Sequence, residues 1–286
     1  MATGAAPTAM RDDGALLVQG IGRLEPGSGP LLVVVGAFDG LHRGHLYLLE
    51  RLRHAAARLG ARPAVLTFDH HPDEIIRGAA PPVLCDPDER LVRFARAGVA
   101  VTIVEHFDAA LRATPYTTFV ERIRARVDLA GFLMTPDAAF GHERRGTPEA
   151  LASLGREDGF TVVVVPPFVV DGRQVRSTEI RAEIAAGDLR DAAHLLGRRV
   201  AVAGAVAERG AAELRVAFPL PAALPPPGRY AVRVEPAWAP GSVESDAAVG
   251  GHATVGGPGD ALAVRSRGRL PASRRVRVSF AAPDRG

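Results

Sequence analysis

Two histidines three residues apart, His42 and His45, lie in a part of the chain that is suited to phosphate chemistry. They follow an unbroken apolar run at Leu31–Val35, and Gly44 stands between them. In the first turn of a helix this spacing points both imidazoles to the same side. The same end of the helix carries backbone N–H groups without intrahelical partners and the positive end of the helix dipole. Such a place binds a polyphosphate well. The residue types therefore predict a site for nucleotide phosphates.

A second group with complementary chemistry, Ser177, Thr178 and Arg181, comes much later in the chain. Hydroxyl side chains favour helix N-termini, so we expect Ser177 and Thr178 to cap a helix that ends at Gly187. This helix terminus is predicted to hold further phosphate oxygens, while Arg181 neutralises a departing pyrophosphate. Phosphoryl-type transfer needs little more than positioning, Mg²⁺ and charge stabilisation. The prediction requires both groups to meet at one triphosphate.

Other phosphate and metal motifs are missing from the sequence. It contains no GxxxxGK[ST] loop and no GxGxxG after a strand. Its one cysteine, Cys85, excludes an internal disulfide framework and a multi-cysteine zinc site. The run Asp69–His71 suggests a metal cluster, but adjacent histidines are poorly spaced as ligands, and we expect a loop built around Pro72. We assign no metal-ligating residue.

Strands and helices that must position these groups alternate along the chain. Apolar runs predict strands at 31–35, 64–68, 99–104, 132–134 and 161–165. Helical spacing, proline starts and glycine stops predict a helix that ends at Leu59 before Gly60, helices near 87–97 and 114–127, and a further helix that begins at Thr147–Pro148. This alternation predicts an α/β fold with a largely parallel sheet, whose ligand lies beyond the carboxyl ends of the strands.

Beyond Arg199 short β-branched runs are separated by Pro/Gly-rich connections. They predict a small all-β barrel or sandwich with strands at 200–206, 214–218, 230–234, 261–264 and 275–280. The arginines between 265 and 277 are expected to lie on a solvated barrel edge. We predict a tail or edge strand at 1–30, an α/β domain at 31–187, a linker helix at 188–199 and the β-barrel-like domain at 200–286. Asp188 is expected to cap the linker helix and Gly197 to end it. Whether the chain starts at Met1 or Met10 stays open.

Five motifs, in order VGAFDGLHRGH, TFDHHPDE, FGHERRG, STEIR and GDLRDAAHLLGR, resemble those of the bacterial bifunctional riboflavin kinase/FAD synthetase family. The resemblance covers residues 31–199. It implies a Rossmann-like HxGH nucleotidyltransferase domain that moves the AMP of ATP onto the phosphate of FMN, with Mg²⁺ and release of pyrophosphate. ATP and FMN are therefore the expected small-molecule partners.

The resemblance also implies roles for individual residues. Phosphate binding and transition-state stabilisation fall to His42, His45 and Arg181. Other nucleotide contacts fall to Gly36, Phe38, Gly44, Asp137, Ser177 and Thr178, and flavin contacts to Phe68, Pro72 and Phe140. Two positions depart from the family pattern, Ala138 (usually aromatic) and Arg176 (usually serine). These departures affect the expected flavin affinity more than the expected transfer chemistry.

The second half resembles the riboflavin kinase barrel of that family only faintly. Where the family has a PTAN segment, residues 217–223 read AFPLPAA, and Ala263 stands in place of the catalytic glutamate. A kinase needs a base near the attacking hydroxyl and oxygen ligands for Mg²⁺. We therefore expect a degenerate barrel that has lost kinase activity.

Composition limits the remaining function classes. The 286 residues are 47% hydrophobic and 23% charged, with a formal net charge of +3, which is typical of a globular protein and does not favour nucleic-acid binding. No apolar run approaches the ~20 residues of a membrane helix, and there is no signal-peptide pattern, so we expect a cytoplasmic protein without membrane partners. A homo-oligomer is possible.

Three alternatives remain open. A related nucleotidyltransferase could use another acceptor, such as a modified flavin, or CTP. A non-catalytic flavin or nucleotide binder would bind these ligands without turnover. The kinase could also survive through unfamiliar residues.

Overall fold

The computed structural model describes residues 9–10, 14–239, 248–256 and 261–281. The chain forms two compact units that interleave along the sequence. Unit 1 comprises Met1–Phe38, His45–Ala80 and Arg93–Phe168, and unit 2 comprises Asp39–Gly44, Pro81–Val92 and Val169–Gly286. The short segments 39–44 and 81–92 thus belong with the C-terminal part of the chain. The domain boundaries predicted in chain order stay a prediction.

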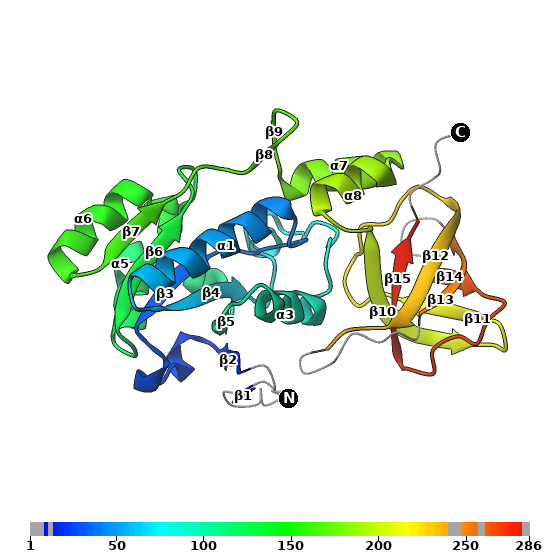
Figure 1. The fold of residues 1–286 in the computed structure, drawn as a ribbon, viewed down its shortest axis with the longest axis horizontal. Coiled ribbons are helices and arrows are strands. Elements are labelled where there is room, and N and C mark those ends of the chain that lie inside the picture. Colours follow the sequence, from blue (N-terminus) through cyan, green and yellow to red (C-terminus); the bar gives the residue numbers. More distant parts are fainter. Residues whose placement is uncertain (1–8, 11–13, 240–247, 257–260, 282–286) are drawn as a thin grey trace. The chain divides into compact units, whose positions relative to one another are not determined.

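A seven-stranded sheet with the order β1-β2-β5-β4-β3-β6-β7 forms the centre of unit 1 (Figure 1). Its parallel strands are β2 (Leu16–Gln19), β3 (Leu31–Val35), β4 (Arg62–Phe68), β5 (Val101–Glu105), β6 (Leu129–Met134) and β7 (Thr161–Val164). The two-residue strand β1 (Ala9–Met10) pairs antiparallel with β2 at the edge. The predicted α/β fold with a parallel sheet is confirmed, and the segment before Leu31 contributes β2 to that sheet.

Helices and short 3-10 turns connect the strands. The helices are α1 (Arg43–Arg58), α2 (Pro72–Arg77), α3 (Pro87–Arg96), α4 (Ala109–Arg112), α5 (Tyr116–Arg124) and α6 (Pro148–Asp158). The 3-10 turns are η1 (Ile21–Arg23), η2 (Pro26–Ser28) and η3 (His142–Arg144). The expected loop around Pro72 is wrong: Pro72 begins α2, because the ring of His71 accepts the Asp73 N–H at 3.2 Å and proline suits the first helical position.

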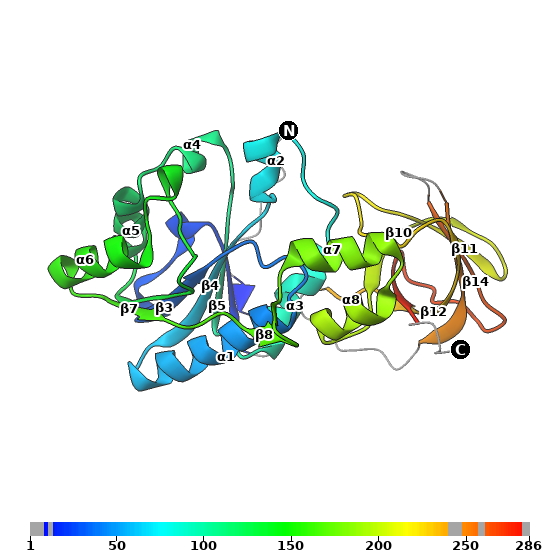
Figure 2. The ribbon, with the colours of Figure 1, turned by 90° about the horizontal axis from the view of Figure 1, so that it is seen from above.

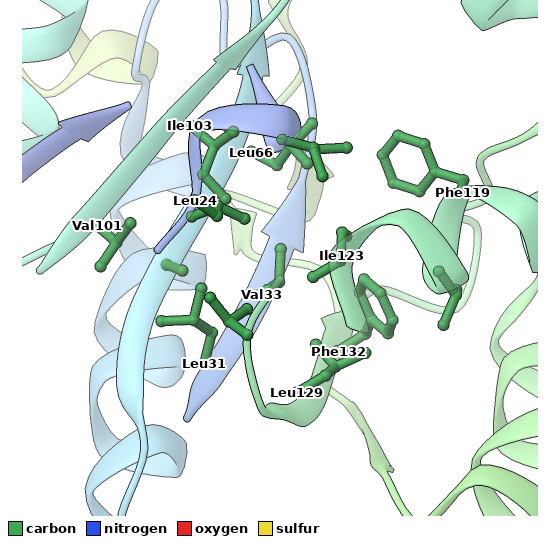
Figure 3. Packing of buried hydrophobic residues seen from close by; sticks show 14 of the residues in the cluster. Leu24, Leu31, Val33, Leu66, Val101, Ile103, Phe119, Ile123, Leu129 and Phe132 are labelled. Carbon is green, nitrogen blue, oxygen red and sulfur yellow. The ribbon is translucent and has the colours of Figure 1, made fainter. Parts of the chain in front are cut away.

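The core of unit 1 packs α5 against one face of the sheet (Figure 3). Leu31 and Val33 of β3 face this core together with Phe119 and Ile123 of α5, which lie four residues apart on one helical stripe. The first four residues of β3 are all buried, so the strand is covered on both faces, as its apolar run predicts. Each large buried side chain contributes roughly 1.5–3 kcal/mol to folding.

The direction in which the sheet is built reverses beside β3. The chain adds β4 and β5 on one side of β3, and β6 and β7 on the other. Parallel sheets bind ligands beyond the carboxyl ends of their strands at such a switch point. Gly36 and Phe38 follow β3, and Asp137 and Phe140 follow β6. Four residues predicted to contact nucleotide or flavin therefore come directly after the two strands at the switch.

Unit 2 joins a helix pair to a closed barrel (Figure 2). A hairpin of β8 (Val169–Val170) and β9 (Arg173–Gln174) precedes α7 (Ser177–Ala186) and α8 (Leu189–Leu196). The predicted caps of α8 are confirmed, because the Asp188 carboxylate accepts the Asp191 N–H at 2.9 Å and Gly197 has the left-handed backbone of a helix stop. Among the helices of the described residues, none is both long and apolar enough to cross a membrane.

The barrel is antiparallel, with the strand order β10-β11-β14-β13-β12-β15. Its strands are β10 (Ala201–Arg209), β11 (Glu213–Ala217), β12 (Gly228–Pro236), β13 (Val249–Val255), β14 (Leu262–Arg265) and β15 (Arg275–Phe280). The expectation of an all-β barrel-like domain is confirmed. The sequence missed β13, whose Gly250 and Gly251 weaken any strand signal.

The expected solvated arginine edge is wrong for Arg275 and Arg277, although Arg265, Arg267, Arg269 and Arg274 are exposed as expected. Strand β15 pairs with both β10 and β12, so it is not an edge. Arg277 is only 7% exposed, and its guanidinium donates to Glu89 at 3.0 Å and to Glu235 at 2.8 Å. Arg275 pairs with Asp86 and Asp88. Arg275 and Arg277 thus pair with carboxylates at the start of α3, and Arg277 also pairs with Glu235 of β12.

Candidate phosphate and flavin sites

The turn between β3 and α1 has a strained backbone. Phe38 and Leu41 have φ angles of +53° and +38°, and Gly40 between them has +85°. Side chains with a Cβ rarely adopt such angles, which cost on the order of 1–3 kcal/mol. The surrounding structure must therefore hold this turn in place, as is common where a backbone is shaped for a ligand.

In unit 1, the ring of Phe38 supports His45. The two ring centroids are 5.1 Å apart, and Phe38 also packs edge-on against Phe94 at 5.3 Å. Phe38 is 3% exposed, and a Cβ on Gly36 would approach its ring to 3.1 Å, so Gly36 leaves the room that the ring needs. This burial favours a supporting role for Phe38. The nucleotide contacts expected for Gly36 and Phe38 stay predictions.

In unit 2, His42 precedes α1 and is 4% exposed. Burial lowers its pKa from 6.5 to about 4, and the positive charges of Arg198 and Arg181 act in the same direction. A backbone hydrogen bond opposes this shift without cancelling it. The imidazole is therefore neutral at pH 7, with one N–H donor and one acceptor nitrogen. Phosphate oxygens placed beside it would favour the protonated, doubly donating form.

The start of α7 is tied to the same turn through Asp39. The Ser177 hydroxyl donates to the Asp39 backbone carbonyl at 2.8 Å, and the Arg181 guanidinium forms an ion pair with the Asp39 carboxylate. The same carboxylate accepts the Leu84 N–H at 3.0 Å, and Arg181 Nε donates to the Pro82 carbonyl at 2.8 Å. One buried acid thus joins three chain segments. Of the two groups on which the sequence prediction depends, His42 lies with Ser177 and Arg181 in unit 2, whereas His45 belongs to unit 1.

The expected capping role of Ser177 is wrong. The N-cap position of α7 is Arg176, and no side chain caps it. Ser177 occupies the first helical position, and its hydroxyl bonds to Asp39 instead. The exposed Thr178 lies one residue further into the first turn. The first backbone N–H groups of a helix have no intrahelical partner, so this terminus is suited to binding an anion.

Gly44 allows His42 to lie close to the neighbouring chain. A Cβ on Gly44 would come within 3.2 Å of two His42 ring atoms and 3.4 Å of the Val175 carbonyl. The 3.2 Å distances are tighter than ordinary van der Waals contact, so a side chain at position 44 would shift the imidazole by a few tenths of an ångström. Gly44 therefore sets the position of His42, in addition to its predicted nucleotide contact.

Two residues that the sequence reading left unassigned belong to this group. Asp39 stands inside the first motif, and Arg198 is the last residue of the fifth. Arg198 Nη1 donates to the Leu41 carbonyl at 3.4 Å, and its charge lowers the pKa of His42. An acid within a glycine-rich turn is a usable signal for Asp39. For Arg198 the usable signal is its place at the end of the motif GDLRDAAHLLGR.

The residues expected to bind flavin lie in unit 1. Phe68 ends β4, and its ring packs edge-on against Phe107 with centroids 5.0 Å apart. Phe140 packs against Phe119 and Phe132 at 5.2 and 5.3 Å, so part of its ring belongs to the core. The Phe68, Phe140 and Pro72 assignments to flavin stay predictions.

Asp137 lies in a closed loop after β6. The Thr135 hydroxyl donates to its carboxylate at 2.8 Å, and Arg144 donates to its backbone carbonyl at 2.9 Å. Backbone bonds between Phe140 and Gly146 close the loop, which has a fixed shape as a result. The exposed carboxylate of Asp137 stays a predicted nucleotide contact.

In the barrel, the segment 217–223 has a structural role. Ala223 donates its N–H to the Val83 carbonyl at 3.0 Å, and Val83 donates to the Pro221 carbonyl at 2.8 Å. Leu262 and Val264 of β14 are buried, so Ala263 between them points to the other face of the strand. The methyl group of Ala263 offers neither a base nor a metal ligand.

Comparison with known proteins supports the resemblance. Residues 26–179 match the FAD synthetase family. The chain is 34% identical over 193 residues to the bifunctional riboflavin kinase/FMN adenylyltransferase of Pseudomonas fluorescens, covering 66% of this chain and 61% of that protein. It is 31% identical over 189 residues to the protein of the same description in Haemophilus influenzae, covering 65% and 61%. The chain thus spans about 61% of the length of these relatives.

A solved structure extends the likeness in fold to both units. A protein of Streptococcus pneumoniae described as a macrolide-efflux protein has a TM-score of 0.75 and 22% sequence identity. The match covers 94% of this chain and 90% of that one. At this identity the likeness shows the fold alone.

Proposed function

Because the chain belongs to the FAD synthetase family, we propose that it is an FMN adenylyltransferase that converts Mg–ATP and FMN into FAD and pyrophosphate. The observation that supports this most is the meeting of His42, Ser177 and Arg181 around Asp39 in unit 2. A cytoplasmic location remains part of the prediction.

The proposed reaction is a direct displacement at the α-phosphorus of ATP. A phosphate oxygen of FMN forms a bond to that phosphorus, and the bond to the oxygen bridging the α- and β-phosphorus breaks. The electron pair leaves on pyrophosphate. The attacking phosphate is already an anion, so no general base has to remove a proton. The protein mainly positions the two anions and stabilises the charge on the leaving group.

Each residue of the unit 2 group has a proposed task. The neutral His42 ring donates its N–H to a phosphate oxygen. His45, which belongs to unit 1, stays a predicted phosphate contact. Arg181 uses two of its five N–H bonds on Pro82 and Asp39, and its remaining donors neutralise the leaving pyrophosphate. Gly44, Thr178 and the first turn of α7 complete the proposed phosphate site.

Mg²⁺ is proposed to arrive with the substrate as Mg–ATP. The Asp39 carboxylate is committed to Leu84 and Arg181, so it is not offered as a ligand for a resident metal ion. Mg²⁺ commonly relies on substrate phosphates and water for most of its ligands. This arrangement fits an enzyme whose metal ion enters and leaves with nucleotide and pyrophosphate.

The flavin is proposed to use residues of unit 1. Phe68 and Phe140 offer aromatic surface, Pro72 begins the adjacent α2, and Asp137 offers a carboxylate to the nucleotide. We also propose that the barrel has no riboflavin kinase activity. Ala263 supplies no base, and residues 217–223 contain no hydroxyl or amide side chain to hold Mg–ATP.

A product assay tests the proposal. The full chain is incubated with Mg²⁺, either ATP or CTP, and either FMN or riboflavin, and pyrophosphate, FAD and FMN are measured. We expect FAD and pyrophosphate only from ATP with FMN, and no FMN from ATP with riboflavin. Pyrophosphate only with CTP or another acceptor would identify a related nucleotidyltransferase. Binding without any product would identify a flavin or nucleotide binder.

Variants connect this activity to the site. We expect Arg181→Ala to lower kcat for FAD formation by about 10²-fold or more, since a charge that stabilises the leaving group is removed. Arg156→Ala, at an exposed position of α6, is the matched control and should keep full activity. Equal activity of the two variants would contradict the proposed role of Arg181.

A further inference from the structure

Asp69, His70 and His106 form a cluster in unit 1 that the proposed transfer reaction does not use. Asp69 and His70 follow β4, and His106 follows β5, the next strand of the sheet. The parallel pairing places Phe68 opposite Glu105, which brings the residues after each strand side by side. One potential ligand atom from each of the three lies within 4.8 Å of the others.

The Asp69 carboxylate is held in one orientation. Its Oδ1 accepts the backbone N–H of His70 at 2.7 Å and that of Phe107 at 3.0 Å. Its Oδ2 is turned to Nδ1 of His106, 2.7 Å away. Ligating carboxylates are commonly oriented by such hydrogen bonds on their other oxygen. One oxygen of Asp69 is thus fixed by the backbone, and the other faces an imidazole.

His70 brings a second imidazole to the same point. Its ring stands nearly perpendicular to that of His106, at 81°, with centroids 5.6 Å apart. Nδ1 of His70 lies 3.2 Å from Oε2 of Glu74 in α2, the short helix labelled in Figure 2. In the tautomer that donates to Glu74, the Nε2 lone pair is available to a metal ion. A carboxylate behind a ligating histidine is a common arrangement in metal sites.

An ordinary surface ion pair explains only part of this geometry. A pair between exposed Asp and His side chains contributes about 0–1 kcal/mol and needs no third group. It does not explain a second imidazole with its own carboxylate partner.

We propose that Asp69, His70 and His106 bind a divalent transition-metal cation such as Zn²⁺ or Co²⁺. Two imidazoles and a carboxylate suit these ions, whereas Mg²⁺ prefers oxygen ligands. The cation lies between Oδ2 of Asp69 and Nδ1 of His106, and a proton on Nδ1 moves to Nε2 or to solvent. Bonds of about 2.0–2.1 Å place neighbouring ligand atoms roughly 3 Å apart, so Asp69 and His106 are already close to the required spacing. The half-exposed His70 side chain completes the site by turning towards them.

The site differs from the one suggested by the sequence. Asp69, His70 and His71 are consecutive, but His71 bonds to the Asp73 N–H at the start of α2. The second histidine is instead His106, which directly follows β5 and lies 37 residues after Asp69 in the sequence. The objection that adjacent histidines are poor ligands does not apply to this set.

Cobalt binding tests the proposal without ATP or FMN, so its failure is distinguishable from failure of the proposed transferase activity. The tag-free full chain is freed of metal with a chelator and titrated with Co²⁺, and visible absorbance and calorimetry are recorded. We expect one Co²⁺ per chain, displaced by Zn²⁺. His106→Ala and His70→Ala should each weaken binding by more than about 100-fold, and Glu74→Gln by about 10–100-fold. His54→Ala, an exposed histidine of α1, should bind like the unchanged protein.

Two results overturn the proposal: no Co²⁺ uptake by the unchanged chain, or uptake that His106→Ala and His70→Ala leave intact. If a variant does not fold, as judged by circular dichroism, the ligands are identified from the spectrum of the unchanged protein. In its histidine ¹H–¹⁵N spectrum, added Zn²⁺ should shift the ring nitrogens of His70 and His106 and leave those of His54 and His142. Shifts at other histidines only would also overturn the assignment.

Discussion

The carboxylate of Asp39 and the guanidinium of Arg181 form an ion pair across 142 residues of sequence, with side chains only 7% and 16% exposed. This pair fixes the start of α7 against the turn that carries His42. Arg181 is thereby ordered before any phosphate arrives, which lowers the conformational entropy lost on binding. Asp39 acts through Arg181, so its expected role is that of a positioning residue.

Replacing Asp39 with asparagine tests this role. Asp39→Asn keeps the size of the side chain but removes the charge that holds Arg181. We expect a loss of about 1–3 kcal/mol in the free energy of unfolding, measured in urea, because the largely buried Arg181 guanidinium loses its counter-charge and keeps only a neutral acceptor. The KM for ATP should rise by about tenfold, with a smaller change in the KM for FMN. Asp73→Asn, in the exposed pair with Arg77, is the control and should change neither. Equal KM effects on both substrates would argue against positioning through Arg181.

The low pKa of His42 makes stability depend on pH. Its pKa is about 4 when folded and near 6.5 when unfolded, so the unfolded chain binds more protons between these values. The contribution of neutral His42 is complete above pH 6.5 and is lost as the pH falls towards 4. Between pH 7 and pH 5 the loss amounts to about 2 kcal/mol.

Unfolding of His42→Gln in urea at both pH values measures this contribution. The variant should lose about 2 kcal/mol less than the unchanged protein on going from pH 7 to pH 5. His54→Gln, which alters an exposed histidine, should behave like the unchanged protein. Parallel pH profiles for the unchanged protein and His42→Gln would show that His42 is not buried in its neutral form.

Gly44→Ala tests the close approach around His42. The new methyl group would lie 3.2 Å from the imidazole and push it from its position. We expect the Kd for ATP, measured by calorimetry, to rise about tenfold or more, because small displacements in a binding site have large effects. Gly22→Ala is a matched control, since a Cβ there meets nothing within 4 Å. If Gly44→Ala binds ATP with unchanged affinity, the position of the His42 ring does not contribute to nucleotide binding.

Arg277 is predicted to matter most for the stability of unit 2. Arg277→Met leaves Glu89 and Glu235, which are 3% and 7% exposed, without their shared cation. Removing one partner of a buried ionic group costs about 3–5 kcal/mol, so the urea midpoint should fall markedly. Arg215→Met, in an exposed pair with Glu208 in the same barrel, should cost less than about 1 kcal/mol. Adding Glu235→Met to Arg277→Met should restore part of the loss. Similar urea midpoints for Arg277→Met and Arg215→Met would show that the buried ion pairs of Arg277 do not stabilise unit 2 more than an exposed pair does.

Local patterns in the sequence predicted much of the secondary structure. The apolar run of β3, the Asp188 and Gly197 ends of α8 and the alternation of strands with helices all depend on residues a few positions apart. The same reasoning failed at β13, where paired glycines hide a strand that its barrel neighbours stabilise. Barrel closure likewise decided that Arg277 is buried, which no local pattern indicates.

The residue types of the phosphate group were readable from the sequence, but their hydrogen-bond partners were not. Sequence reasoning expected Ser177 to cap its own helix, and it left Asp39 and Arg198 without a role. In the structure Ser177 and Arg181 bond to Asp39, and His106 replaces His71 beside Asp69. A side chain bonds to whichever group the fold places within about 3 Å, and that neighbour can be more than a hundred residues away along the chain. Periodicity and capping act within a few residues, so the sequence alone determined the elements and the chemistry they carry, whereas tertiary packing decided which groups meet.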